Sequence, residues 1–270
     1  MPSTPPEAVR CRIEIDRLRK NFSVNGREMI AVDDASFRIN DGEFVALLGP
    51  SGCGKSTILN MVATLIAPSG GAIKVDGAPV AFGRPMRQVG YVFQKDTLFP
   101  WRTVEDNVGY ALEIAGVPAP ERKQRVAEAI HQAGLDGFAR YYPASLSGGM
   151  RQRVSLMRTL ISRPEILLMD EPFGALDTHT KLDMHSVLLG LWEGQRQTVL
   201  FVTHDLGEAL TLADRIILLS ARPGRVKQDF RVDFPRPRDA VTLRETPQYA
   251  ELFSHVWHSL GEEFAKGHSA

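Results

Sequence analysis

The chain has 270 residues, and its 32 Lys and Arg residues balance 32 Asp and Glu residues, so the formal net charge is zero. This balance provides neither the basic field of a nucleic-acid-binding protein nor an acidic tail, and we expect no nucleic-acid partner. No apolar run approaches the roughly 18 residues of a transmembrane helix, and residues 1–10 form a tail without the apolar core of a signal peptide.

Apolar patterning in the first 50 residues predicts three strands. Residues 11–18 alternate between apolar and polar side chains, and we interpret them as an edge strand. A second, roughly alternating region covers residues 30–39. Residues 44–48 read Phe-Val-Ala-Leu-Leu, a short apolar run that predicts a buried strand.

A glycine-rich stretch follows this strand and fits the phosphate-loop pattern G-x-x-x-x-G-K-[ST]. Its residues are Gly49, Pro50, Ser51, Gly52, Cys53, Gly54, Lys55, Ser56 and Thr57. Apolar residues then recur at helical spacing from Ile58 to Ile66, so the loop leads into a helix N-terminus, where backbone N–H groups and the helix dipole favour an anion. We expect Lys55 to reach the β- and γ-phosphates of a nucleotide and the Ser56 hydroxyl to bind Mg²⁺. A plain glycine turn is the alternative, which the flanking strand and helix disfavour.

The middle of the chain contains both strands and helices. Residues 72–77 predict a small hairpin, and residues 89–93 predict a strand that ends at Gln94. From about residue 95 to residue 160 the pattern becomes helical and is broken by Gly and Pro, so we infer an inserted helical subdomain.

Parallel α/β character returns with predicted strands at residues 166–169, 198–203 and 215–219. The resulting fold class is α/β, with a mainly parallel sheet flanked by helices and an antiparallel β subdomain. Residues 227–270 differ in composition and form a C-terminal extension. Its last helix is predicted to begin with Thr246 as N-cap and Pro247 at the first position, and we expect it to dock on the parent domain. A partner-binding helix is the alternative.

Two carboxylates end the strand at residues 166–169. Asp170 would face the same crevice as the phosphate loop and hold Mg²⁺, and Glu171 would polarise a water for attack on the γ-phosphorus. Acidic residues also end strands simply for solubility, but their position after a phosphate loop favours the catalytic interpretation. His179 and Asp183 have helical spacing and could ligate a metal, although a solvated helix face is the expected role because no third ligand is in view.

The segment Leu-Ser-Gly-Gly at residues 146–149 lies about 20 residues before this acidic pair. With the phosphate loop and the acidic motif, it makes residues 11–226 resemble the ATP-binding subunit of ATP-binding-cassette (ABC) transporters, a P-loop NTPase cassette. In that family the segment caps a helix that grips ATP held by a second, facing subunit. The resemblance therefore implies that Ser147, Gly148 and Gly149 bind nucleotide across a dimer, and a homodimer is the simpler expectation.

Further positions match this family in order. The resemblance implies that Gln94 touches Mg²⁺ and the attacking water, that His204 hydrogen-bonds the γ-phosphate, and that Asp177 belongs to a loop crossing the dimer interface. Phe22 has the position of the aromatic residue that stacks on adenine, with burial in the sheet as its alternative. The implied cofactors are ATP and Mg²⁺.

The sequence contains one cassette and no membrane span, and this indicates which branch of the ABC family it resembles. A separate permease is implied, as in importers, and the segments at residues 173–177, 221–226 and 234–239 are similar to the nitrate, sulfonate and taurine importer class. The apolar patch Leu-Phe-Pro-Trp at residues 98–101 would dock a cytoplasmic helix of the permease, unless it is buried in the subdomain core. A periplasmic or lipid-anchored solute-binding protein and a peripheral position at the cytoplasmic face of the inner membrane are also implied.

Two other classes of protein share part of this pattern. A soluble cassette ATPase that acts on DNA or ribosomes would need a long coiled-coil insertion or tandem cassettes. A small-molecule kinase or a GTPase shares the phosphate loop, but neither class explains Leu-Ser-Gly-Gly before the acidic pair.

Overall fold

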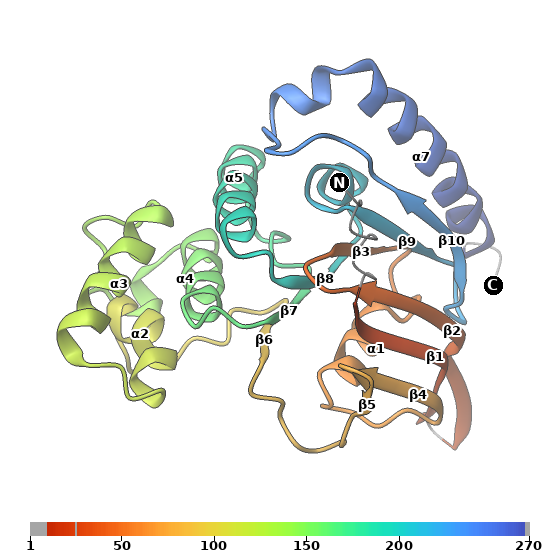
Figure 1. Cartoon of the computed structure of the whole chain (residues 1–270), viewed down its shortest axis with the longest axis horizontal. Coiled ribbons are helices and arrows are strands. Elements are labelled where there is room, and N and C mark those ends of the chain that lie inside the picture. Colours follow the sequence, from red (N-terminus) through yellow and green to blue (C-terminus); the bar gives the residue numbers. More distant parts are fainter. Residues whose placement is uncertain (1–9, 25, 268–270) are drawn as a thin grey trace, which may run out of the picture.

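A six-stranded sheet crosses the larger lobe of the computed structural model, which describes residues 10–24 and 26–267 (Figure 1). The strand order is β10-β9-β3-β8-β7-β6, and every neighbouring pair except the antiparallel β9–β10 pair is parallel. The strands are β3 (Phe44–Leu48), β6 (Val89–Val92), β7 (Ile166–Asp170), β8 (Thr198–Thr203), β9 (Arg215–Leu219) and β10 (Val226–Arg231). The predicted mainly parallel sheet is confirmed. The predicted tail, residues 1–10, lies outside the described residues except for Arg10.

Both faces of this sheet are covered, which explains the continuous apolar run in β3. Phe44 and Leu48 point into the core on the side of the helical lobe, whereas Val45 and Leu47 point into a second core shared with α1 (Lys55–Val62). All five residues of the strand are fully buried. A strand buried on both faces has no polar side to alternate with its apolar one.

A second, antiparallel sheet packs over α1 and has the order β2-β1-β4-β5. Its strands are β1 (Cys11–Val24), β2 (Arg27–Asn40), β4 (Gly70–Val75) and β5 (Ala78–Pro79). The expected hairpin is confirmed as β4 and β5, but the interpretation of residues 11–18 as an edge strand is wrong, because β1 pairs with β2 on one side and with β4 on the other. Alternation shows that one face of a strand is covered and carries no information about its two edges.

The first helix is shorter than its apolar spacing predicts. Helix α1 ends at Val62, and Thr64 adopts a left-handed conformation with φ of 62°. Leu65 and Ile66 therefore lie beyond the helix, and Leu65 is 52% exposed.

The smaller lobe consists of helices inserted between β6 and β7 (Figure 1). They are α2 (Val104–Ile114), α3 (Ala119–Gln132), the short 3₁₀ helix η1 (Pro143–Ser145) and α4 (Gly148–Leu160). Thr103 caps α2 by accepting a hydrogen bond from the Asp106 amide. Helices α5 (Thr178–Gln195) and α6 (Leu206–Leu212) belong to the larger lobe.

The C-terminal extension lies along the β10 edge of the main sheet (Figure 1). After the unpredicted strand β10, the chain passes through a 3₁₀ helix, η2 (Thr242–Glu245), into α7 (Pro247–Gly267). Val256 and Leu260 of α7 are buried in the main core, so the prediction that this helix docks on the parent domain is confirmed. None of the described helices is both long and apolar enough to cross a bilayer.

Candidate functional site

The phosphate loop, residues 49–54, lies between the end of β3 and the start of α1. Gly54 has φ of 102°, and a Cβ on this residue would approach the Ala31 carbonyl oxygen to 2.8 Å. The loop is therefore pressed against β2 at this point, and only glycine fits both the backbone conformation and the space. Gly54 directly precedes Lys55, the first residue of α1, so this contact fixes where the helix begins.

Lys55 is 5% exposed although it carries a charge. Its Nζ donates hydrogen bonds to the carbonyl oxygens of Gly49, at 2.7 Å, and Pro50, at 2.8 Å. The backbone of the loop thus holds the ammonium group within its own curve. A cation in this position, next to a helix N-terminus, can donate to the oxygens of a bound phosphate.

Cys53 is also buried, with 1% of its surface exposed. Burial raises the pKa of its thiol, and the nearby Lys55 ammonium acts in the opposite direction. A covered, protonated thiol is a poor nucleophile. Cys53 therefore acts as a small packing residue within the loop.

Ser56, in the first turn of α1, meets Asp170 at the end of β7. The Ser56 hydroxyl donates to Asp170 Oδ1 at 2.8 Å, and Asp170 is 7% exposed. Burial raises the pKa of the Asp170 carboxyl, while the bond from Ser56 acts in the opposite direction. A hydroxyl and a carboxylate are hard oxygen ligands of the kind that Mg²⁺ prefers, so the two residues fit this ion.

Glu171, one residue further along, is the centre of a second cluster. Its Oε2 accepts a hydrogen bond from Gln94 Nε2 at 3.2 Å and lies 3.1 Å from His204 Nδ1. Glu171 has φ of 44°, a left-handed conformation that is uncommon for a residue with a Cβ. The structure thus brings together three residues that the sequence analysis selected from the ends of β6, β7 and β8.

Residues that were not predicted from the sequence hold the segment around His204, between β8 and α6, in place. The Thr203 hydroxyl donates to the Glu208 carboxylate at 2.6 Å, and Lys181 Nζ lies 2.8 Å from the same carboxylate. Asp205 caps α6 by accepting from the Glu208 amide at 3.2 Å. The spacing Asp-x-x-Glu at residues 205–208 is the capping-box pattern and could have revealed this helix start.

Ser147 and Asp177 both cap helices. Ser147 accepts from the Met150 amide at the start of α4, and Asp177 accepts from the Thr180 amide at the start of α5. The hydrogen bonds from Thr180 lower the pKa of the Asp177 carboxyl. Ser147 and Gly148 are exposed in the smaller lobe, and Figure 1 shows α4 across the molecule from α1. A single chain does not bring the Ser147–Gly149 segment to its own phosphate loop.

The remaining candidates lie on other surfaces. Phe22 is half-buried on β1, with Lys20 Nζ 5.1 Å from the centre of its ring. His179 and Asp183 pair at 3.3 Å on an exposed face of α5, and the described residues contain no group of three metal-ligating side chains. This agrees with the expected solvated face.

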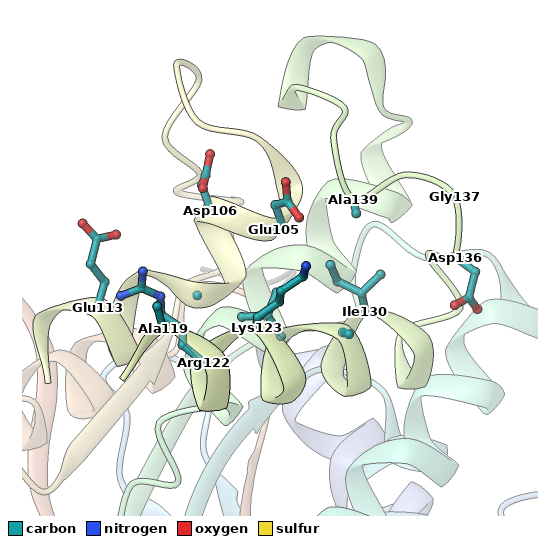
Figure 2. A pocket seen from close by; sticks show the side chains of 13 residues that line it. Glu105, Asp106, Glu113, Ala119, Arg122, Lys123, Ile130, Asp136, Gly137 and Ala139 are labelled. Atoms are coloured by element: carbon teal, nitrogen blue, oxygen red, sulfur yellow. The ribbon is translucent and has the colours of Figure 1, made fainter. Parts of the chain in front are cut away.

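A separate hollow of about 370 Å³ lies between α2 and α3 in the smaller lobe (Figure 2). Glu105 and Asp106 of α2 line it together with Arg122 and Lys123 of α3. None of the predicted site residues lines this hollow, so the candidate site remains the edge of the sheet at the phosphate loop.

Comparison with known proteins identifies the family of the chain. Residues 32–174 match a family model described as ABC transporter. The chain is 47% identical to the taurine import ATP-binding protein TauB of Rhizobium johnstonii, over 90% of this chain and 94% of that one. It is 38% identical to the nitrate import ATP-binding protein NrtD of Synechococcus elongatus, over 98% of this chain and 97% of that one. Among solved structures, a dimeric post-hydrolysis state of the ATP-binding cassette MJ0796, bound to ADP and Pi, is 32% identical and superposes with a TM-score of 0.75, covering 83% of this chain and all of that one.

Proposed function

Because the chain belongs to the ABC transporter family, we propose that it is the ATP-hydrolysing subunit that powers import of a small anion through a separate membrane permease. The observation that carries the proposal is the cluster of Gln94, Glu171 and His204 beside the Ser56–Asp170 pair, because it supplies both a general base and a metal site at one sheet edge. Similarity to TauB and NrtD along nearly the whole chain supports a sulfonate, taurine or nitrate as the solute.

Each residue has a role in this proposal. The phosphate loop and Lys55 would bind the phosphates of ATP, while Ser56, Asp170 and Gln94 would hold Mg²⁺, which would supply positive charge to neutralise the phosphates. Glu171 accepts a proton from the water that attacks the γ-phosphorus. His204 donates a hydrogen bond to the γ-phosphate and stays oriented because Thr203 and Asp205 fix the loop on both sides of it.

The active form is proposed to be a homodimer. The phosphate loop and the Ser147–Gly149 segment lie in different lobes, and Ser147 and Gly148 are exposed, as they must be to reach another molecule. The dimeric MJ0796 structure supports this arrangement. Two copies would enclose two ATP molecules, each between the phosphate loop of one copy and the Ser147–Gly149 segment of the other. Asp177 would lie at this interface.

The permease is proposed to dock on the segment after Gln94. Trp101 is 71% exposed, and its ring lies 5.6 Å from that of Phe99, which in turn packs against Tyr110 of α2. An exposed tryptophan on an aromatic support is typical of an interface anchor. The subunit would then sit peripherally at the cytoplasmic face of the membrane, with a solute-binding protein on the opposite side.

The test is to tag the full chain, solubilise native membranes gently and identify the proteins that co-purify. We expect a multi-span permease, together with a periplasmic or lipid-anchored solute-binding protein whose ligand can then be screened among sulfonates, taurine and nitrate. Recovery of soluble proteins or nucleic acid alone would contradict the transport function while leaving ATP hydrolysis intact.

A further inference from the structure

The turn between β9 and β10, residues 220–225, packs directly against the phosphate loop. The Gly224 amide donates to the Ala31 carbonyl oxygen at 3.0 Å, and the Gly224 carbonyl oxygen accepts from the Asp33 amide at 2.9 Å. A Cβ on Gly224 would lie 2.0 Å from the Cys53 carbonyl oxygen, so the two backbones are in contact. This turn therefore forms one wall of the phosphate loop, on the side opposite β8.

The C-terminal helix holds this turn through a buried carboxylate. Glu263 of α7 is 2% exposed, and its Oε2 accepts a hydrogen bond from the Ala221 amide at 2.9 Å. Its Oε1 lies 2.9 Å from Nζ of Lys227 on β10. Lys227 also donates to the Ser259 carbonyl oxygen at 2.8 Å, which ties β10 to the same part of α7.

These contacts form an unbroken path from α7 to the nucleotide site. Glu263 binds the first residues of the turn, the turn contacts Cys53 through Gly224, and Cys53 lies within the phosphate loop. Figure 1 shows α7 arching over the β10 edge, with its C-terminal end near this turn. A hollow of about 880 Å³ opens on the same wall and is lined by both the turn and residues 50–52 of the phosphate loop.

We propose that Glu263 and Lys227 are positioning residues for nucleotide binding, through which the C-terminal helix keeps the β9–β10 turn seated against the phosphate loop. A buried carboxylate is costly to hold in place, and this one lies where α7 meets the turn. With the link broken, the Ala221 end of the turn would lose its anchor while the Gly224 bonds to β2 remain, and the nucleotide would have to order part of the loop as it binds. Ordering a binding loop during binding weakens affinity.

The test uses the isolated full chain and Mg-ADP, so neither the permease nor hydrolysis enters the result. Glu263→Gln keeps the side-chain size but removes the charge, and Lys227→Met removes its partner. We expect each variant to raise the Kd for Mg-ADP by roughly 2- to 30-fold, the range observed for positions coupled through packed networks. The Kd of the double variant for Mg-ADP should not exceed the higher of the two single-variant Kd values, because both substitutions break the same link.

Two further measurements separate positioning from a general loss of stability. Glu251→Gln removes the same charge from an exposed site on α7 and should leave the Kd unchanged. Amide exchange at Ala221 and across the phosphate loop should accelerate in Glu263→Gln, while exchange in β7 and β8 stays as in the parent chain.

The proposal is overturned if Glu263→Gln and Lys227→Met bind Mg-ADP as tightly as the parent chain, or if Glu251→Gln weakens binding equally. It is also overturned if exchange accelerates uniformly, because α7 would then only stabilise the fold. If Glu263→Gln does not fold, Lys227→Met alone decides the outcome. None of these results depends on the solute or on the permease.

Discussion

At the scale of single residues, Glu171 combines an uncommon backbone conformation with a carboxylate shared between Gln94 and His204. We expect Glu171→Gln to retain ATP binding but to lower the rate of hydrolysis by roughly 10²- to 10⁴-fold, the usual contribution of a general base. Steady-state phosphate release and equilibrium ATP titration measure the two quantities. Glu128→Gln, an exposed charge change on α3, should leave both unchanged. Full activity in Glu171→Gln would remove this residue from the mechanism.

Ser56 provides a second residue-scale test, because its hydroxyl touches Asp170 at the proposed magnesium position. Chelation of divalent metal should abolish hydrolysis. Ser56→Ala should raise the Mg²⁺ concentration needed for half-maximal activity by about tenfold or more, since loss of an oxygen donor weakens metal binding. Ser186→Ala, at an exposed position on α5, serves as the control. An unchanged Mg²⁺ requirement in Ser56→Ala would contradict the assignment.

The motif residues could be predicted from the sequence because each motif lies directly at the end of a strand or the start of a helix. The phosphate loop, Gln94, Glu171 and His204 all follow strands at one sheet edge, so neighbouring motifs converge there. Lys181 and Glu208 could not be selected in the same way. Their meeting depends on how α5 packs against α6, which no local pattern reports.

At the scale of elements, the loop after β6 carries the exposed aromatic anchor. We expect Trp101→Ala to leave ATP hydrolysis in solution unchanged but to lower recovery of the permease from solubilised membranes by about 30-fold or more, as for a buried interface tryptophan. Trp257→Ala, on α7 and 53% exposed, is the matched control. Normal membrane assembly and full transport by Trp101→Ala would show that the permease docks elsewhere.

Most helices and strands are predictable from the sequence, and two exceptions, β10 and the end of α1, have identifiable causes. The sequence does not indicate strand β10, because Val-Lys-Gln-Asp-Phe-Arg has two apolar residues, Val226 and Phe230, separated by three polar ones, and so does not alternate. Helix α1 was overextended because the left-handed Thr64 interrupts an apolar spacing that continues to Ile66. In both cases the tertiary environment overrides a pattern that is too short to decide the structure.

At the scale of the whole molecule, the two lobes place the phosphate loop and the Ser147–Gly149 segment apart. This separation could be expected only from the family resemblance. The spacing of two motifs in the sequence does not show whether they lie close together in the folded chain. The contact between Glu263 and Ala221, 42 residues apart, likewise appears only in the folded chain. The chemistry of each half-site could therefore be predicted from the sequence, whereas the arrangement of the two half-sites is seen only in the fold.

We propose that one chain carries an incomplete nucleotide site, which ATP completes by joining two copies of the chain. The most direct measurement is light scattering of purified Glu171→Gln with Mg-ATP, with Mg-ADP and without nucleotide. We expect a dimer only with Mg-ATP, and loss of that dimer when Ser147→Arg is added, because a bulky charge would block the exposed cap of α4. A monomer at saturating Mg-ATP would contradict it.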